Sequence, residues 1–238
     1  MGVATDLNRF YELLAHAHTA IGGYRYLKTL GSGAEIPDRG IFFFFEVGEM
    51  RHGGHDFRAV HAGTHALGAG RNATLWQRLL DHKGDNADIG GNHRKSALRK
   101  HIGFALLTRR PRKFKAGLAE TWALKSPGAG KSNRANIGEM EAPLEAEVSL
   151  FVRNMPLLWV TVGDRPSENS HRGVLMANAV RLLGGARTRA LDPPSKGWLG
   201  HDADSRTIRQ SGLWNAKHVG EPYDPRFLDL LETYVEDM

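Results

Sequence analysis

The strongest constraint on the fold is a short apolar segment near residue 40. Residues 40–47 read GIFFFFEV, and residues 41–45 form the densest apolar run in the chain. Five residues are enough for a strand and too few for a buried helix. A polar, glycine-rich turn at residues 48–56 separates this segment from a second strand candidate at residues 57–63. The sequence therefore predicts a β-hairpin.

Most other segments have helical patterns. Leu7, Phe10, Leu14 and Ala17 recur at spacings of three and four residues, which predicts an amphipathic helix over residues 5–30. Asn72 or Thr74 can cap a second helix that runs to residue 82. Later segments predict helices at residues 95–107, 143–154 and 172–183 and near the C-terminus, and a third strand at residues 157–162.

This order of elements predicts an α+β fold in which a small mixed or antiparallel three-stranded sheet is flanked by helices. The hydrophobic content of 41% is sufficient for a real core. We divide the chain into an N-terminal helical extension (1–39), a central domain (40–184) with a basic insertion (93–142), and a C-terminal extension (185–238) that packs on the core.

The composition restricts metal chemistry and location. The chain has no cysteine, so any metal must be held by carboxylates, histidines or water. The first ten residues include Asp6 and Arg9 and lack the apolar segment of a signal peptide, and no run of eighteen apolar residues occurs. We therefore expect a cytoplasmic protein that does not enter a membrane.

Positive charge is concentrated in one part of the chain. The net charge is +6, but residues 93–134 hold twelve lysines and arginines against one acid, Glu120. Such a block repels itself unless an anion lies against it, so we interpret it as a DNA-binding surface, with a merely solvated basic face as the alternative. The expected contacts are Arg94, Lys95, Arg99, Lys100, Arg109, Arg110, Arg112, Lys113 and Lys131.

Two glycine-containing segments could also bind phosphate. Residues 128–132 read GAGKS, but the first glycine of a Walker A loop would fall at Lys125, and we expect no helix in the polar residues that follow. We interpret the segment as a basic loop and keep a nucleotide-binding enzyme using Lys131 as an alternative. Residues 90–94 (GGNHR) predict either a phosphate-binding turn or a helix start capped by Asn92.

Three short motifs follow one another in the hairpin and the next helix. The first strand carries GIF (40–42), the second carries VHAG (60–63), and the helix carries LWQR (75–78). In this order they resemble the GIY-YIG nucleases, whose hairpin carries G-[IV]-Y and Y-[IV]-G and whose next helix carries L-x-x-R. The resemblance covers roughly residues 40–183.

The resemblance implies hydrolysis of phosphodiester bonds with Mg²⁺ or Mn²⁺. In the transition state, an arginine fork and a divalent cation stabilise the charge on the phosphate oxygens, and a polar group orients the attacking water. The resemblance assigns the fork to Arg78, and His82 lies one helical turn later. With Thr64 and His65 at the hairpin exit, the expected catalytic set is Arg78, His61, His82, Thr64 and His65.

The chain departs from the family pattern at three positions. Phe42 replaces the first tyrosine and cannot form a hydrogen bond, whereas His61 replaces the second and can still act as a base. The metal-binding glutamate of the family would fall at Met176, and methionine is a poor ligand for Mg²⁺. The metal ligand therefore stays open, and the candidates are Glu147, Glu168 and Asp164.

Two functions follow from these observations. The first is a metal-dependent DNA endonuclease in which Arg78 clamps the phosphate and His61 and His82 orient or activate water. The second, favoured by Phe42 and Met176, is a catalytically degenerate nucleic-acid-binding module of a repair, restriction or defence system.

Overall fold

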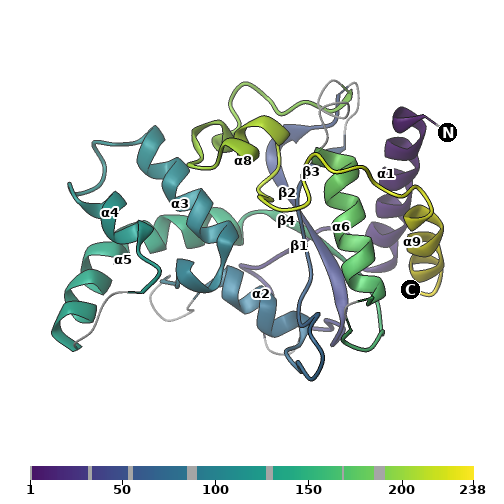
Figure 1. The fold of residues 1–238 in the computed structure, drawn as a ribbon, viewed down its shortest axis with the longest axis horizontal. Helices are drawn as coiled ribbons and strands as arrows, with labels where there is room; N and C mark the ends of the chain where they lie inside the picture. The colour runs from purple at the N-terminus through teal and green to yellow at the C-terminus, as the bar shows by residue number, and fades with distance from the viewer. Residues whose placement is uncertain are drawn as a thin grey trace.

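The predicted hairpin forms one side of a four-stranded antiparallel sheet (Figure 1). A computed structural model describes residues 2–31, 34–52, 56–84, 90–126, 131–167, 169–184 and 191–238. The strands, in chain order, are β1 (Arg25–Tyr26), β2 (Gly40–Met50), β3 (Phe57–Gly63) and β4 (Pro156–Thr161). Their order in the sheet is β1-β4-β2-β3, so the hairpin, the third predicted strand and the α+β class are confirmed.

Helices surround this sheet. The α-helices of the described residues are α1 (Val3–Ala20), α2 (Leu75–Lys83), α3 (Ala97–Arg109), α4 (Leu118–Ala123), α5 (Lys131–Arg153), α6 (His171–Gly184), α8 (Arg206–Ser211) and α9 (Phe227–Glu236). Two short 3₁₀ helices are η1 (His93–Lys95) and η2 (Leu199–Asp202). Within the described part of the chain, no helix has the length and apolar character needed to cross a bilayer.

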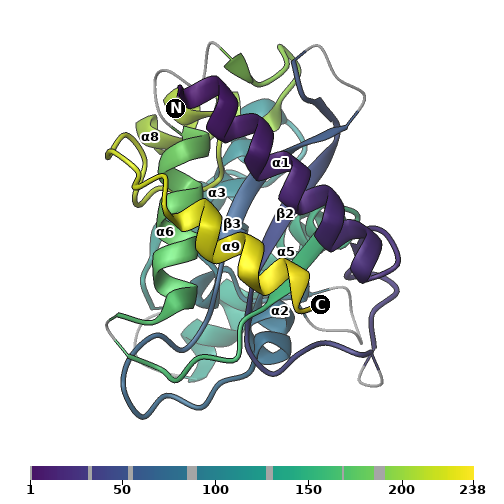
Figure 2. The same ribbon diagram turned by 90° about the vertical axis from the view of Figure 1, so that its right-hand side faces the viewer.

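The apolar run of β2 is buried on both faces of the sheet. Ile41, Phe43 and Phe45 pack with α1, α6 and α9 in one core, whereas Phe42 and Phe44 pack with α2, α3 and α5 in another. Figure 2 shows α1 and α9 side by side across the first face. Alternate side chains of a strand point to opposite faces, so a strand covered on both sides needs consecutive apolar residues.

The first helix is shorter than predicted. The structure ends α1 at Ala20, where the sequence pattern predicted a helix to residue 30. Gly22 and Gly23 follow with φ angles of 72° and 103°, a conformation that terminates helices and that glycine adopts at little cost. The next residues form β1 against β4, a two-residue strand too short for a sequence pattern to indicate.

Helix α5 is longer than predicted. It begins at Lys131 and continues through Pro143, so the loop expected up to residue 142 and the helix start expected at Pro143 were both wrong. Residues 135–140 of α5 are exposed or only partly buried, so no apolar stripe marks this part of the helix. Glu141 and Glu145 are buried, at 4% and 5% exposure, through ion pairs with arginines that apolar periodicity does not reveal.

Capping side chains begin α2 and α3, and α3 starts at Ala97, two residues after the predicted start. Thr74, one of the two predicted caps, accepts from the backbone N of Gln77 at 3.2 Å, and the Gln77 side chain accepts from the Thr74 backbone at 2.9 Å. This reciprocal capping box fixes the direction in which α2 leaves the hairpin. The Ser96 hydroxyl accepts from the backbone N of Arg99 and caps α3.

The C-terminal segment attaches to the free edge of β3. The backbone N of Trp214 donates to the Val60 carbonyl at 2.7 Å. The Asn215 side chain accepts from the backbone N of Ala62 at 3.0 Å and donates to its carbonyl at 2.8 Å. This amide occupies bonding positions that a further strand would use, which protects the sheet edge. The domain boundaries at residues 39 and 184 stay predictions.

Candidate active site

A cavity of about 350 Å³ lies between the end of β3 and helix α2. The loop after β3 supplies one wall, and α2 supplies the other. The polar and apolar side chains that line it include Thr64, His65, Leu67, Gln77, Arg78 and Asp81. The structure thus brings three of the five expected catalytic residues, Thr64, His65 and Arg78, around one space.

Arg78 holds a partly exposed positive charge in this cavity. Its Nη1 atom donates to the carbonyl of Lys95 at 3.0 Å and lies 3.7 Å from the Asp81 carboxylate. Burial lowers the pKa of Arg78, while the charge of Asp81 opposes this, and a guanidinium stays protonated under all physiological conditions. The side chain is 29% exposed, so it can still bind an anion.

His61 and His82 lie in the core beside Arg78 and do not line the cavity. Their ring centroids are 6.0 Å apart, and both contact the rings of Phe42 and Phe44. Burial lowers the pKa of His61 to about 3 and that of His82 well below its ordinary value, and the Arg78 charge adds to both effects. Both imidazoles are therefore neutral near pH 7.

Each of these imidazoles has an unused nitrogen. Nδ1 of His61 and Nε2 of His82 are buried and have no hydrogen-bond partner among the described residues. A buried polar atom without a partner costs stability, so its presence indicates a position where water or a substrate group binds.

Ser96 and Arg99 hold His82 in place. Nδ1 of His82 lies 2.8 Å from the Ser96 hydroxyl, which also caps α3. The Arg99 guanidinium donates to the His82 carbonyl at 3.0 Å. The position of the His82 ring therefore depends on how Arg99 is held.

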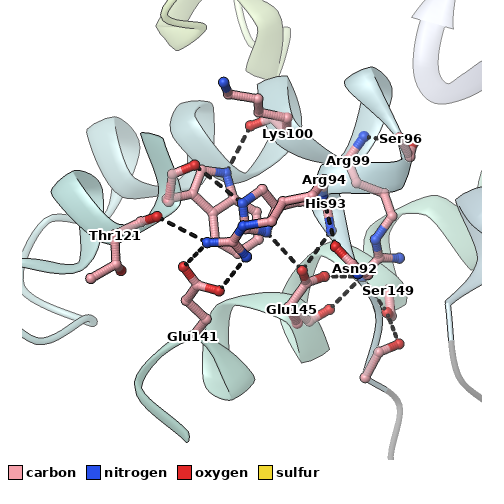
Figure 3. A network of polar contacts seen from close by, with 12 residues as sticks. Asn92, His93, Arg94, Ser96, Arg99, Lys100, Thr121, Glu141, Glu145 and Ser149 are labelled. Atoms are coloured by element: carbon pink, nitrogen blue, oxygen red, sulfur yellow. Dashed lines mark hydrogen bonds and ion pairs between the residues drawn. The ribbon is translucent and has the colours of Figure 1, made fainter. Parts of the chain in front are cut away.

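Glu145 is the centre of a buried polar network that holds Arg99 (Figure 3). Its carboxylate pairs with Arg99 and accepts from the backbone N and from Nδ1 of His93, at 2.7 and 2.9 Å. Arg99 also donates to the Ser149 hydroxyl at 2.9 Å. Burial by itself would raise the pKa of Glu145, but the His93 hydrogen bond and the Arg99 charge outweigh it and lower the pKa. The ionised carboxylate thus joins α5 to α3.

Several basic residues expected to bind DNA form ion pairs with acidic side chains of the same chain. Arg94 forms two hydrogen bonds with Glu141, at 2.7 and 2.8 Å, and Arg99 is fully buried against Glu145. Arg109 pairs with Asp202, and Glu147 pairs with both Arg110 and Lys113. The partner acids come from later in the chain, so the count over residues 93–134 overstated the self-repulsion.

The other expected DNA contacts differ in environment. Lys95 and Arg112 are exposed and Lys100 is half-buried, and none of the three has an ion-pair partner within the described residues. The Lys131 side chain lies outside the described part of the structure. At residues 90–94, the Asn92 side chain accepts from the backbone N of Arg94 at 3.0 Å, so the capped helix start is confirmed.

His65 is oriented by Arg172. The Arg172 guanidinium donates to the His65 carbonyl at 2.9 Å and lies 3.2 Å from its Nε2. A guanidinium can only donate, so Nε2 accepts and the neutral ring carries its hydrogen on Nδ1. Burial and the Arg172 charge lower the pKa of His65 to about 4. The candidate metal ligand Asp164 is engaged in an ion pair with this same arginine.

The other metal-ligand candidates do not line the cavity. Glu147 pairs with Arg110 beyond the end of α3, and Met176 packs into the core on the opposite face of the sheet. Glu168 lies outside the described residues. Asp81 is the carboxylate that lines the cavity. In the described ranges, no three histidine, aspartate or glutamate side chains gather closely enough to hold a metal by themselves.

The GAGKS segment lacks the setting of a phosphate-binding loop. Helix α5 begins at Lys131, so the expectation that no helix follows this segment was wrong. However, the preceding element is helix α4, whereas a Walker A loop follows a strand. Residues 128–130 lie outside the described part. Without a preceding strand or the first glycine, the nucleotide-hydrolase interpretation loses its support.

Sequence reasoning missed the residues that support the site. Ser96, Glu145 and Arg172 were not singled out, and Arg99 was expected to bind DNA, yet these four contact the candidate catalytic histidines or each other. Asp81 could have been found, because it lies three residues after Arg78 on the same helix. No local pattern indicated the other four.

The comparisons with known proteins place the chain in a family. Residues 1–238 match the GIY-YIG domain, so the protein belongs to the GIY-YIG family. This family is of nuclease type, acts on nucleic acid and generally depends on a divalent metal ion. A search of curated proteins and a search of solved structures each found no match. The family expected from the three motifs is confirmed.

We expect Glu145→Gln to destabilise the protein strongly. The substitution keeps the shape of the side chain but leaves the Arg99 charge buried without an anion, which costs about 3–5 kcal/mol. Glu147→Gln on the same helix is the matched control, since it removes only partly exposed ion pairs worth about 0–1 kcal/mol. Urea denaturation measures both variants. Equal losses in the two variants would contradict the role assigned to Glu145.

We also expect His61 to make stability depend on pH. Its pKa is lower in the folded protein than its unfolded value of about 6.5, so its contribution is complete above pH 6.5 and is lost as the pH falls toward 3. Between pH 7.5 and 5.5 the free energy of unfolding should fall by about 1 kcal/mol more in the wild type than in His61→Phe. The exposed-site variant His16→Gln is the control. Identical pH profiles for wild type and His61→Phe would refute this expectation.

Proposed function

We propose that this protein is an endonuclease that hydrolyses phosphodiester bonds of DNA in the cavity beside Arg78. The observation that carries the proposal is the position of a partly exposed guanidinium opposite Thr64 and His65, at the exit of the family's hairpin. A guanidinium fork suits the non-bridging oxygens of a phosphate, where negative charge increases during hydrolysis.

The polar groups around Arg78 can orient a nucleophilic water. The Thr64 hydroxyl donates to the Gly40 carbonyl at 2.9 Å, so its oxygen remains able to accept a hydrogen from water. The Nδ1–H group of His65 is buried without a partner among the described residues, so we assign it to a water that enters the cavity wall beside the phosphate. The neutral His61 and His82 lie behind the cavity wall, and their low pKa values make them weak bases, so we assign their unused nitrogens to accepting a hydrogen bond from a water that enters beside Arg78.

The cavity provides one carboxylate for a divalent cation. Mg²⁺ sites often use one or two protein carboxylates and complete their shell with water and substrate phosphate. Asp81 is suited to this role because it lines the cavity close to Arg78. A bound Mg²⁺ or Mn²⁺ ion would supply additional positive charge for the phosphate oxygens.

The exposed basic residues give the DNA a path to this cavity. The Lys95 carbonyl contacts Arg78, so the exposed Lys95 side chain starts beside the cavity. Lys100 and Arg112 lie along and just beyond α3, and they add charge without ion-pair partners in the described residues. We assign these residues to contacts with the phosphate backbone, which would make binding sensitive to salt.

One observation favours a second candidate function. Phe42, at the position of the family's first tyrosine, is fully buried in the core, and Met176 packs on the opposite face of the sheet. A protein without these two catalytic groups can retain the fold as a nucleic-acid-binding module. Cleavage and binding must therefore be measured separately.

The test is nicking of supercoiled plasmid DNA in Mg²⁺ or Mn²⁺, with EDTA as the metal-free control. We expect Arg78→Ala to lower the rate by about a hundredfold or more, the effect of removing one group that stabilises transition-state charge. The matched control is Arg71→Ala. Arg71 is an exposed arginine in the loop before α2, and its side chain does not line the cavity. Its rate should stay within a fewfold of the wild type.

The outcomes separate the two functions. Metal-dependent nicking that disappears in Arg78→Ala and persists in Arg71→Ala supports the endonuclease. Salt-sensitive DNA binding without nicking supports the binding module. Nicking that is equally fast in Arg78→Ala would reject the proposed site.

A further inference from the structure

A second cavity, distinct from the one at Arg78, contains an unusual carboxyl group. Glu46 of β2 helps to line a space of about 340 Å³. Its Oε2 atom accepts from the indole Nε1 of Trp198 at 3.2 Å and of Trp214 at 3.3 Å. Its Oε1 atom makes no hydrogen bond to any described residue. One carboxyl oxygen is therefore fixed by the protein, and the other remains able to bind a ligand.

The environment of Glu46 disfavours a negative charge on its carboxyl group when no ligand is bound. Burial raises the pKa of Glu46 to about 7, although the two indole donors act in the opposite direction. A group in this state gains stability from any ligand that offers a hydrogen-bond donor to the free oxygen.

The walls of this cavity are largely apolar and suit a ligand with a flat, apolar face. They include Val47, Leu106, Leu150, Phe151 and Met155. Val47 and Leu150 are 68% and 47% exposed, which is high for large hydrophobic side chains. Phe151 adds an aromatic ring on which a planar group can stack. Apolar walls with a few fixed polar groups are typical of ligand sites.

The rim of the cavity is basic. Arg110 and Lys113 both pair with Glu147, at 3.4 and 2.7 Å, and their side chains are 53% and 46% exposed. Two cations share a single carboxylate, so one positive charge is not compensated within this cluster. An anionic group can bind here while the rest of the ligand enters the cavity.

We propose that this cavity binds a nucleotide, with its base against Phe151, an N–H group of the base on Oε1 of Glu46, and its phosphate at Arg110 and Lys113. A nucleobase has apolar faces and a polar edge, which match the walls and the carboxyl group. Guanine should bind tightest, because its N1–H and N2–H groups are adjacent donors. The ligand in the cell would be an unstacked nucleotide of a bound strand.

The position of the cavity fits a strand that also reaches Arg78. Helix α3 connects Ser96, beside His82, to Arg110 at the rim, a distance of about 20 Å at 1.5 Å per residue. This distance is several nucleotides of an extended strand. The inference rests on the proposed function only in taking nucleic acid as the natural ligand, because binding of a free nucleotide requires no cleavage.

The test is a titration of the wild type and of Glu46→Gln with dGMP. Binding is monitored by tryptophan fluorescence and checked by calorimetry. In this variant the two indole donors would hold the oxygen of the new side-chain amide and place its NH₂ group where Oε1 lies. This NH₂ group is a hydrogen-bond donor and would face the N–H donors of the base, so no hydrogen bond could form between them. We therefore expect dGMP binding at least about tenfold weaker. Phe151→Leu should weaken binding about fivefold or more through lost stacking. Asp229→Asn, which removes an exposed acid on α9 away from this cavity, is the control and should bind as tightly as the wild type.

Each outcome bears on the proposal. Saturable dGMP binding that weakens in Glu46→Gln and in Phe151→Leu, with unchanged circular dichroism, supports it. Absence of dGMP binding to the wild type would overturn it. So would dGMP binding to Glu46→Gln and to Phe151→Leu that is as tight as binding to the wild type. Binding lost in Arg78→Ala but kept in Glu46→Gln would also overturn it, by placing the nucleotide in the other cavity. If the wild type binds dGMP but does not nick plasmid DNA, the proposed endonuclease function is rejected and the nucleotide site is retained.

Discussion

The burial of β2 on both faces determines how the rest of the molecule is arranged. Its consecutive apolar residues require cover on each side, so the helices divide into two sets and two cores form. The candidate active site belongs to the core under α2 and α3, where Phe42 and Phe44 surround His61 and His82. The same dry surroundings that stabilise the sheet keep these histidines neutral.

A polar network supports the apolar core at this site. Arg99 is fully buried, and its two terminal nitrogens donate to Glu145, Ser149 and the His82 carbonyl, whereas its Nε has no partner among the described residues. A buried ion pair of this kind adds little net stability compared with apolar packing, but it fixes positions well when every partner is present. We infer that the network positions His82, whose ring centroid lies 6.0 Å from that of His61.

Local patterns predicted the parts of the fold that depend on local physics. The apolar run, the glycine-rich turn and the capping box of Thr74 indicated the hairpin and α2, and three short motifs indicated the family. The first half of α5 was missed because its exposed residues form no apolar stripe and its buried Glu141 pairs with Arg94, far away in the chain. Arg172 was missed and Arg99 was assigned to DNA, because pairing of distant residues leaves no periodic signal.

The central claim is that the phosphate to be cleaved binds at Arg78 beside the neutral histidines. A crystal structure of the protein with a short DNA duplex, in Ca²⁺ in place of Mg²⁺, tests it most directly. The account predicts a phosphate within hydrogen-bond distance of the Arg78 guanidinium, with Thr64 and His65 facing it. A duplex whose phosphates all lie away from this cavity would contradict the account, even if the basic residues along α3 were in contact with the DNA.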